Sequence, residues 1–356
     1  MHVVAAAPAI SPNPSFAVEE YLVSTCGLTR PQALKASPKL SHLKSYTNPD
    51  AVLAFLSGLG ADVAALVAKD PQLLCAKVEK TLAPNVAELT GLGLSRSEIV
   101  RLVSLTGAHF RYMSIVSKLH YYLSLFDSSE DLLRALKCGA FLLAPNLEQV
   151  VKPNVAFLRE CGLATCDIAK LCLSSRWLLT ANPERLRAMV ACAQGLGVPC
   201  GSRMFRHALQ AVAFLSEEKI AAKAEYMRKA FRWSDAQAGT VVSKLPTILA
   251  WSNDMIQSKA EFLISEVGLE PGYIAYRPAL LTYSLDGRLR PRYYVVKFLK
   301  ENGSLDQDRS YYSAVMVMEN VFMDKYICPH KEAAPHLTED YAAACRGEVP
   351  TRFRFA

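Results

Sequence analysis

Apolar residues recur along this chain at the three- and four-residue spacing of helices that bury one face. Val86, Leu89 and Leu92 mark one such stretch, and Ile99 and Leu102 mark the next. No strict alternation of apolar and polar residues competes with this helical period. Because 51% of the 356 residues are hydrophobic and 21% are charged, the chain has enough apolar surface to bury a core. The pattern predicts an all-α protein.

A glycine followed by a leucine separates the two helical stretches of a pair. Glycine accepts the left-handed backbone conformation that commonly follows the end of a helix. The pairs are Gly27-Leu28, Gly93-Leu94, Gly162-Leu163 and Gly268-Leu269. We therefore predict a tight turn between two helices at each of these places.

A proline closes the second stretch in several copies of the pattern, and another proline opens the next copy. Proline lacks the amide hydrogen that a continuing helix needs, so it stops the second helix. The closing prolines are Pro38, Pro71, Pro246 and Pro278, with Gly107, Ala140 and Arg176 in equivalent places elsewhere. We expect Pro84, Pro153 and Pro291 to lie in the first turn of the helix that follows.

The chain resembles itself at a fixed offset. Residues 84–102 and 153–171 are identical at nine of nineteen positions, at an offset of 69 residues, or two units of about 34. Residues 223–227 also match residues 259–263 at an offset of 36. Equivalent first positions are expected at Pro84, His120, Pro153, Met189, Lys223, Lys259 and Pro291, with earlier copies near Phe16 and Ala51.

One helix pair cannot bury its own apolar face, whereas stacked pairs form a continuous core. The sequence therefore predicts a curved superhelical solenoid of helix–turn–helix units. We expect residues 1–15 to be disordered or the remnant of a trimmed targeting segment, residues 16–301 to form the repeats, and residues 302–356 to form a helical cap.

Positive charge is concentrated in the middle and later part of the chain. The whole chain carries 40 basic and 33 acidic residues, a net charge of +7. Counted by segment, the net charge is +1 for residues 1–150, +9 for residues 151–300 and −3 for residues 301–356. A local excess of this kind favours a polyanionic partner, although a merely solvated basic surface is the alternative.

Motifs for catalysis, cofactors, metals and membranes are missing from the sequence. Its ten cysteines form no C-x-x-C pair, and no Cys/His cluster has zinc spacing. Neither a phosphate-binding glycine loop nor a G-x-S-x-G nucleophile motif is present. There is no apolar run of the roughly 18 residues that a membrane span needs. We expect no enzyme activity, no cofactor, no metal and no membrane partner.

Basic residues recur at one point of the second helix in four successive copies. These residues are Arg101, Arg134, Lys170 and Arg206, at steps of 33, 36 and 36. A solenoid places equivalent positions in a column, and such a column of cations matches a phosphate backbone. The alternative is a row of solvated ion pairs within each helix, Glu98 with Arg101, Asp131 with Arg134 and Asp167 with Lys170.

A second basic cluster lies around Pro291, where tyrosines are interleaved with cations. Its basic residues are Arg277, Arg288, Arg290, Arg292 and Lys297, and its tyrosines are Tyr276, Tyr283, Tyr293 and Tyr294. Cations bind phosphates and exposed rings stack on bases, although tyrosines at helical spacing commonly belong to a core. The candidate nucleic-acid contacts are therefore Arg101, Arg134, Lys170, Arg206, Lys244, Arg277, Arg288, Arg290 and Arg292.

The repeat L-x-x-x-G-L…I-x-x-L…P-x-L-L, and above all the segment from Arg277 to Arg292, resembles the mitochondrial transcription termination factor (mTERF) family. The resemblance runs from about Phe16 to Leu337, and the segment Phe322 to Tyr326 is similar to the land-plant branch. It implies a curved solenoid of helix–helix–3₁₀ repeats. It also implies a basic concave groove that binds double-stranded DNA or, in some members, structured RNA.

Organelle gene expression follows from the same resemblance, as transcription termination or initiation, intron splicing or ribosome assembly. We expect a mitochondrial location, with the chloroplast as the alternative, and a monomer. A different class of function is a helical-repeat scaffold that binds peptides. A continuous basic face favours nucleic acid, whereas a mostly apolar face favours a peptide partner.

Overall fold

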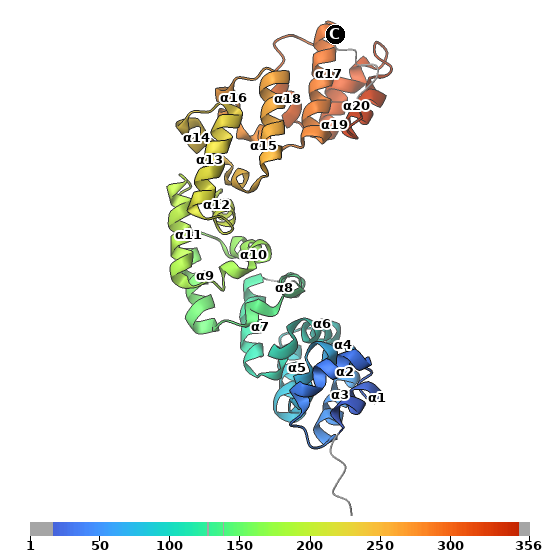
Figure 1. Ribbon diagram of the computed structural model, residues 1–356. Coiled ribbons are helices and arrows are strands. Elements are labelled where there is room, and N and C mark those ends of the chain that lie inside the picture. The colour runs from blue at the N-terminus through green and yellow to red at the C-terminus, as the bar shows by residue number, and fades with distance from the viewer. Residues whose placement is uncertain (1–16, 127, 138, 349–356) are drawn as a thin grey trace, which may run out of the picture. The chain divides into compact units, whose positions relative to one another are not determined.

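The computed structural model describes residues 17–126, 128–137 and 139–348 (Figure 1). Within these residues, helices joined by turns and loops are the regular structure, and no strand occurs. The expectations for residues 1–15 and for a repeat beginning near Phe16 fall outside the described residues. The chain divides into two compact units, Met1–Leu186 and Arg187–Ala356, and the boundary falls inside helix α11 (Pro183–Gly195).

Unit 1 contains the helices α1 (Val18–Ser24), α2 (Arg30–Ala36), α3 (Thr47–Leu59), α4 (Val63–Lys69), α5 (Ala83–Gly91), α6 (Arg96–Thr106), α7 (Ser114–Phe126), α8 (Ser129–Lys137), α9 (Lys152–Glu160) and α10 (Thr165–Ser174). Unit 2 contains α12 (Phe205–Val212), α13 (Glu217–Phe231), α14 (Asp235–Lys244), α15 (Asn253–Ala260), α16 (Pro271–Tyr276), α17 (Arg290–Glu301), α18 (Tyr311–Met316), α19 (Glu319–Phe322) and α20 (Leu337–Cys345).

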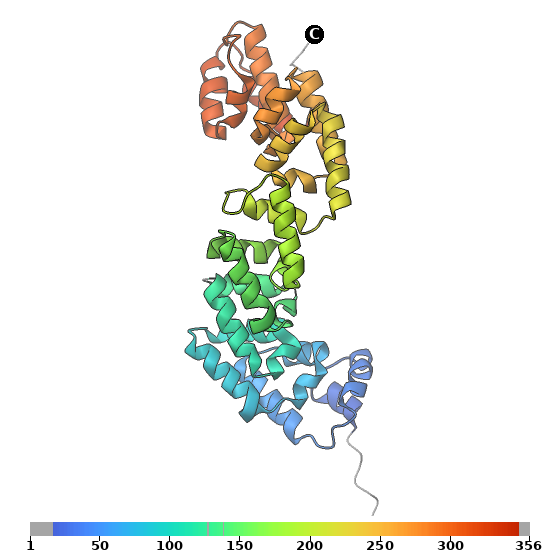
Figure 2. The same cartoon turned by 90° about the vertical axis from the view of Figure 1, so that its left-hand side faces the viewer.

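Helices of the same kind pack on one another in successive repeats. Second helices pack on the next second helix, as α6 does on α8 and α14 on α16, and first helices do the same, as α5 does on α7 and α13 on α15. Within unit 1, the helix pairs follow one another in chain order (Figure 2). This stacking is the expected way for helix pairs to share one apolar core.

The glycine turns are confirmed. Gly27, Gly93, Gly162 and Gly268 have φ angles of 72°, 88°, 81° and 77°, in the left-handed region where a side chain is strained. The leucine after each glycine donates its amide hydrogen back to the preceding helix, as Leu94 does to the carbonyl of Leu89 at 3.3 Å. This arrangement satisfies a carbonyl that the helix end leaves free.

The proline stops are confirmed as well, because a short 3₁₀ turn begins at each of three closing prolines. These turns are η2 (Pro71–Cys75), η8 (Pro246–Ala250) and η10 (Pro278–Thr282). The three places without proline also begin 3₁₀ turns, namely η4 (Gly107–Arg111), η5 (Ala140–Leu143) and η7 (Arg176–Leu178). The repeat therefore dictates this turn even where proline is absent.

Pro84, Pro153 and Pro291 occupy the second residue of α5, α9 and α17, which confirms their place in the first turn of these α-helices. A π-helical turn precedes each of these α-helices: η3 (Val78–Leu82), η6 (Leu147–Val151) and η11 (Leu285–Leu289). Proline cannot donate the usual bond to the residue four positions back. The wider π turn lets the helix run through the proline, with Ala83 bonding to the carbonyl of Val78.

A polar side chain on each of seven first helices donates hydrogen bonds to carbonyls at or just after the 3₁₀ turn of its own repeat or, in the case of Arg292, of the short helix α18. We call these anchor residues: Asn48, Asn85, Lys118, Asn154, Lys223, Lys259 and Arg292. The side-chain amide of Asn154, for example, donates hydrogen bonds to the carbonyl of Leu179 at 2.9 Å and to that of Ala181 at 2.8 Å. The anchors satisfy carbonyls that the short turn leaves without a helical partner.

The anchors also fix the register of the repeat. Asn85 follows Pro84 directly, so its counterpart Lys118 follows Ser117. The copy expected to begin at His120 therefore begins near Ser117, and that expectation was wrong by a few residues. The anchor contact recurs beyond residue 301, because Arg292 donates to Val317 at 2.6 Å.

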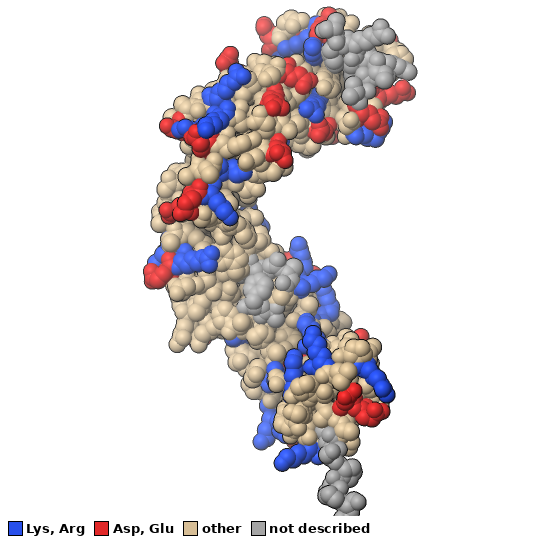
Figure 3. Space-filling model, viewed as in Figure 1, with Lys and Arg blue, Asp and Glu red and all other residues tan. Residues whose placement is uncertain are grey.

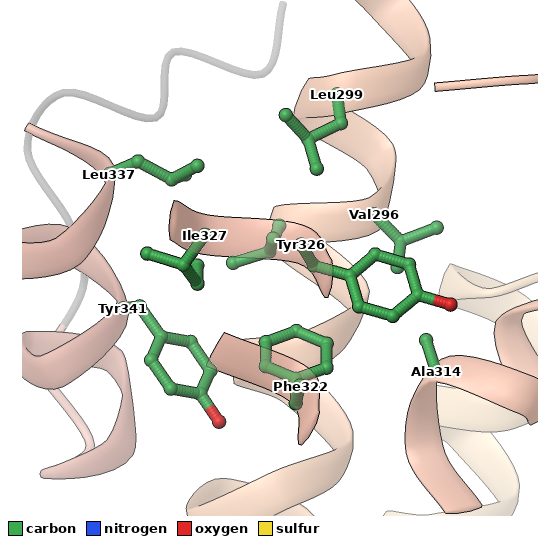
Figure 4. Close-up of a cluster of buried hydrophobic side chains, with 9 residues drawn as sticks. Val296, Leu299, Ala314, Phe322, Tyr326, Ile327, Leu337 and Tyr341 are labelled. Carbon is green, nitrogen blue, oxygen red and sulfur yellow. The ribbon is translucent and has the colours of Figure 1, made fainter. Parts of the chain in front are cut away.

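An aromatic cluster holds the last helices of unit 2 together (Figure 4). The ring of Phe322 stacks on Tyr326 at 4.9 Å and meets Tyr341 at 5.2 Å. Val296 and Leu299 of α17 pack against these rings. Residues 311–345 are thus joined to the last repeat by a hydrophobic core. Within the described residues, no helix is both long and apolar enough to pass through a membrane.

Candidate nucleic-acid interface

Three basic residues occupy one repeated position on neighbouring helices of unit 1. Arg101, Arg134 and Lys170 are each the sixth residue of their helix, α6, α8 and α10, and each precedes its 3₁₀ turn by six residues. The side chains are exposed, and α8 packs on both α6 and α10. We call these three residues the cation ladder. Figure 3 shows blue Lys and Arg side chains over the α6 and α8 region.

Arg101 pairs across the repeat rather than within its own helix. Its guanidinium donates two hydrogen bonds to Glu130 of α8, at 2.8 and 3.1 Å. The expected pair of Glu98 with Arg101 was therefore wrong. Glu98 instead accepts hydrogen bonds from Ser95 and from Ser129 of α8, and these contacts lower the pKa of Glu98 to about 2.

The other two members of the ladder differ in their partners. Arg134 donates to Asp131 at 2.9 Å, which confirms the expected pair within α8. Lys170 forms no ion pair within the part of the chain that the structure describes, so the expected pair with Asp167 is not formed. One rung of the ladder is thus without a counter-charge in the described region.

Solvent exposure keeps the two paired arginines available to an anionic ligand. Side-chain exposure is 51% for Arg101 and 64% for Arg134. An ion pair in such a setting contributes about 0–1 kcal/mol, because water and salt screen it. A phosphate that approaches these side chains therefore competes with weak partners.

In unit 2, the two candidates on second helices do not share the ladder position. Arg206 is the second residue of α12, is half-buried, and lies 3.0 Å from the ring nitrogen of His207. Lys244 is the last residue of α14 and is exposed. The column of equivalent cations thus stops at Lys170.

Lys244 and Arg277 belong to a patch in which cations lie over tyrosine rings. The Lys244 ammonium lies 4.8 Å from the centre of the Tyr276 ring, and the Arg277 guanidinium lies 4.3 Å from Tyr273 and 5.3 Å from Tyr312. Tyr276 is 69% exposed. We call these five residues the tyrosine patch. It combines cations with a ring face that solvent reaches, a combination that suits the stacking of an unpaired base.

Arg292 was wrongly expected to contact nucleic acid, because it is fully buried. It is an anchor residue that donates to Ala314 at 2.8 Å and to Val315 at 3.1 Å, and it pairs with Glu319 at 2.7 Å. Its place directly after Pro291 matches that of Asn85 after Pro84. The arginine is therefore a part of the fold rather than of a binding surface.

Arg288 and Arg290 are half-exposed but already engaged. Arg288 donates to the carbonyls of Val315, at 2.9 Å, and Val317. Arg290 pairs with Asp286 at 2.6 Å, four residues earlier. Both residues stay predicted nucleic-acid contacts. Most hydrogen-bond donors of the basic motif around Pro291, however, already bind acceptors within the protein.

Lys69, the counterpart of Lys244 in unit 1, was not among the residues predicted from the sequence. Both lysines lie two residues before the proline that begins a 3₁₀ turn, Pro71 and Pro246. Lys69 is exposed and donates to the carbonyl of Ser104 in the next second helix, at 2.8 Å. The shared spacing of lysine and proline was the signal that pointed to it.

Among the described residues, no three His, Cys, Asp or Glu side chains come close enough together to hold a metal ion. Three cysteines that the structure describes are buried: Cys26, Cys161 and Cys172. Burial raises the pKa of Cys172 to about 12. A thiol held in its neutral form is a packing group rather than a nucleophile.

Comparison with known proteins points to one family. A model of the mTERF family matches residues 53–202 and 129–322 of this chain. A transcription termination factor of Arabidopsis thaliana, chloroplastic MTERF8, is 23% identical over 277 residues, which is 76% of this chain and 54% of that protein. Mitochondrial MTEF18 from the same plant is 29% identical over 103 residues, or 29% of this chain and 18% of that protein.

Mitochondrial MTERF15 of Arabidopsis thaliana is 29% identical over 92 residues, which is 26% of this chain and 21% of that protein. The chain thus spans about half the length of the first of these relatives and less of the other two. The family model covers most of the helical repeats. On these matches, the chain belongs to the mTERF family, in its plant branch.

Proposed function

We propose that this chain is a non-catalytic protein that binds double-stranded DNA and regulates transcription, by termination or initiation, in an organelle. The observation that carries the proposal is the cation ladder, Arg101, Arg134 and Lys170, repeated on three helices that pack on one another. Family membership supports the same reading, because the relatives are named transcription termination factors.

The expected solenoid would place these cations along one curved face, where successive phosphates of a DNA backbone contact successive cations. Contacts to phosphates give affinity that does not depend strongly on base sequence. Each phosphate contact also releases bound counterions, so affinity falls steeply as salt rises. The proposed contact set is the cation ladder together with Arg206, Lys244, Arg277, Arg288 and Arg290. Lys69 is added because it holds the same place before its 3₁₀ turn as Lys244 does.

A mitochondrial location is proposed first and a chloroplast location second. Two of the relatives are named mitochondrial and the one with the longest match is named chloroplastic. Imaging the full-length protein fused to a fluorescent reporter, in plant cells with both organelles marked, tests this. Signal confined to chloroplasts would reverse the order, and signal in neither would refute an organelle function.

The DNA proposal is tested by fluorescence anisotropy over a series of salt concentrations. The ladder variant carries Arg101→Gln, Arg134→Gln and Lys170→Gln. A control variant removes the same charge at three exposed lysines outside the candidate interface, through Lys229→Gln, Lys325→Gln and Lys331→Gln. The ladder variant should bind duplex DNA more weakly, with a salt slope reduced by about 0.9 for each phosphate that it no longer neutralises. Equal effects of the two variants would refute the ladder as the DNA-binding surface.

Structured RNA is the second candidate partner, and the tyrosine patch is the observation that favours it. An exposed ring beside cations suits unpaired bases, which RNA loops present and duplex DNA does not. Such binding would serve intron splicing or ribosome assembly. Tighter binding to a structured RNA than to a DNA duplex of the same charge, in the same anisotropy series, would favour this function. Absence of binding to both would favour a peptide-binding scaffold.

A further inference from the structure

A cleft of 780 Å³ opens in unit 1 where the loop before α3 faces the start of η3. Three lysines line it: Lys44 from the loop, and Lys77 and Lys80 from the chain around η3. Hydroxyl groups of Ser45 and Thr47 line the same cleft. We call it the lysine cleft. Its size is that of an ordinary small-ligand site, and its walls offer charged and neutral hydrogen-bond donors.

The three lysines of this cleft form no ion pair within the described part of the chain, although Glu79 lines the cleft with them. No described carboxylate pairs with Lys44, Lys77 or Lys80. Arg101 and Arg134 of the cation ladder, in contrast, each have a carboxylate partner. Cations of like sign that line one cavity without partners repel one another, and an anion that enters the cavity relieves this repulsion.

Unit 2 has a cleft at the equivalent place in the repeat, and its chemistry is different. That cleft has a volume of 620 Å³ and is lined by Trp251, Tyr283, Asp254 and Asp286. An anchor residue lines each cleft, Asn48 in unit 1 and Lys259 in unit 2. The two sites are thus built on the same backbone frame.

Lys44 lies four residues before the anchor Asn48, and Met255 holds that position before the anchor Lys259. Lys77 lies eight residues before the anchor Asn85, and Ser284 holds that position before the anchor Arg292. The position of Glu79 is taken by Asp286, so the acidic residue is common to both clefts. The repeat therefore supplies the cavity in both units, while unit 1 lines it with three lysines and unit 2 with one, the anchor Lys259. Three lysines set into a frame that elsewhere carries aspartates mark a site for anions.

We propose that the lysine cleft binds a ligand with two or more adjacent phosphate groups. Ammonium groups pair with phosphate oxygens as point charges, and hydroxyl groups donate the additional hydrogen bonds that phosphate accepts. Adjacent phosphates match three lysines better than a single carboxylate does. They come either from a nucleic-acid backbone, in which case the site rests on the proposed function and extends it, or from a free phosphorylated molecule.

Tripolyphosphate is the probe, titrated into the full chain by isothermal titration calorimetry. The cleft variant Lys44→Gln, Lys77→Gln and Lys80→Gln should bind it at least about tenfold more weakly, because neutral glutamines cannot form charge-assisted hydrogen bonds to phosphate. The control variant Lys229→Gln, Lys325→Gln and Lys331→Gln removes equal charge elsewhere and should bind it as the unchanged chain does. Equal affinity of the cleft and control variants would overturn the proposal.

A second variant guards against loss of binding through misfolding. Glu79→Gln removes the carboxylate from the cleft and should bind tripolyphosphate several-fold more tightly, a gain that unfolding cannot produce. No change in affinity in Glu79→Gln would count against a ligand inside the cleft.

The source of the phosphates is decided by a DNA and RNA titration of the cleft variant. If the cleft variant binds nucleic acid more weakly, and tripolyphosphate competes with nucleic acid for the unchanged chain, then a nucleic-acid backbone occupies the cleft. Unchanged nucleic-acid binding alongside lost tripolyphosphate binding identifies a free phosphorylated ligand. If the unchanged chain binds tripolyphosphate in the cleft but no nucleic acid, the cleft proposal holds and the proposed function fails.

Discussion

Arg292 and Glu319 join the last repeat to the helices that follow it, with Nη2 of the arginine 2.7 Å from Oε2 of the glutamate. Arg292 is fully buried, whereas the Glu319 side chain is 61% exposed. The carboxylate also accepts a hydrogen bond from Tyr341 at 2.8 Å. One guanidinium thus connects α17 to the turn after α18, and through Glu319 to α20.

Replacement of Arg292 by alanine should lower the free energy of unfolding by about 3 kcal/mol or more. The change leaves the carbonyl of Ala314 without its donor, which costs about 1–3 kcal/mol, and takes one of two donors from Val315, which Arg288 still reaches. The cavity left by a fully buried side chain adds to this loss. Urea denaturation followed by circular dichroism measures the loss. Arg134→Ala is the matched control on an exposed, paired arginine and should cost no more than about 1 kcal/mol. Similar losses for the two variants would contradict the anchor role.

The helices and turns could be predicted because local chemistry determines them. A left-handed turn at Gly93 and a helix stop at Pro246 follow from the residue itself, whatever surrounds it. The anchors could not be predicted in this way. Asn85, in the sequence, is a polar residue near a helix start, and its partner is a backbone carbonyl at Phe110, 25 residues away.

For the candidate interface, the cation ladder could be predicted from the sequence, whereas the burial of Arg292, within the basic motif around Pro291, could not. The ladder follows from spacing alone, because equivalent positions of stacked helices face the same way. The burial of Arg292 depends on which face of α17 turns toward α18, and charge does not reveal that. A charged side chain stabilises the fold where it donates hydrogen bonds to backbone carbonyls that have no other donor, as Arg292 does to Ala314.

Arg232 should be replaceable by glycine with a gain in stability. It follows α13 with a φ of 56° and is the only non-glycine residue with positive φ in the part of the chain described by the structure. Relief of left-handed strain, about 1–2 kcal/mol, should exceed the entropy cost of an added glycine, and the net gain should be about 0.5–1 kcal/mol. Thermal and urea unfolding of Arg232→Gly measure it.

Gly93→Ala supplies the opposite change at an equivalent turn, where φ is 88°. It should lower the stability by about 1 kcal/mol, because alanine is strained in that conformation. A loss of stability in Arg232→Gly would show that the arginine side chain contributes more than its backbone strain costs.

Glu98 should make part of the stability depend on pH. Its contacts with Ser95 and Ser129 lower its pKa to about 2, so the unfolded chain takes up this proton at a higher pH than the folded chain does. The stabilisation is fully present above the ordinary carboxyl pKa and is lost as the pH falls through about 2.

Glu98→Gln should therefore be less stable than the unchanged chain at pH 7, and the difference should shrink between about pH 5 and pH 2. Urea unfolding at a series of pH values measures this convergence. Glu88→Gln removes one charge from the neighbouring helix α5 without touching either serine. The same pH profile in both variants would show that net charge, and not the serine contacts, produces the effect.

The tyrosine patch should distinguish unpaired from paired nucleic acid. Tyr276 is 69% exposed, and Lys244 lies 4.8 Å from the centre of its ring. A base can therefore stack on the exposed face of the ring while Lys244 stays beside it. Stacking on an aromatic side chain contributes about 1–3 kcal/mol per base, whereas a duplex presents no free base face. Tyr276→Ala should therefore weaken binding to a single-stranded oligonucleotide at least about fivefold and leave duplex binding unchanged.

The salt dependence separates the ring from the cation within this patch. Tyr276→Ala should keep the salt slope for the single strand, because the tyrosine ring carries no charge, while Lys244→Gln should reduce it by about 0.7. Fluorescence anisotropy with both oligonucleotides measures affinity and slope together. Tyr112→Ala is the control, an exposed tyrosine beside Arg111 in unit 1. If both tyrosine variants weakened single-strand binding equally, stacking at Tyr276 would be refuted, because any exposed ring would then serve as well.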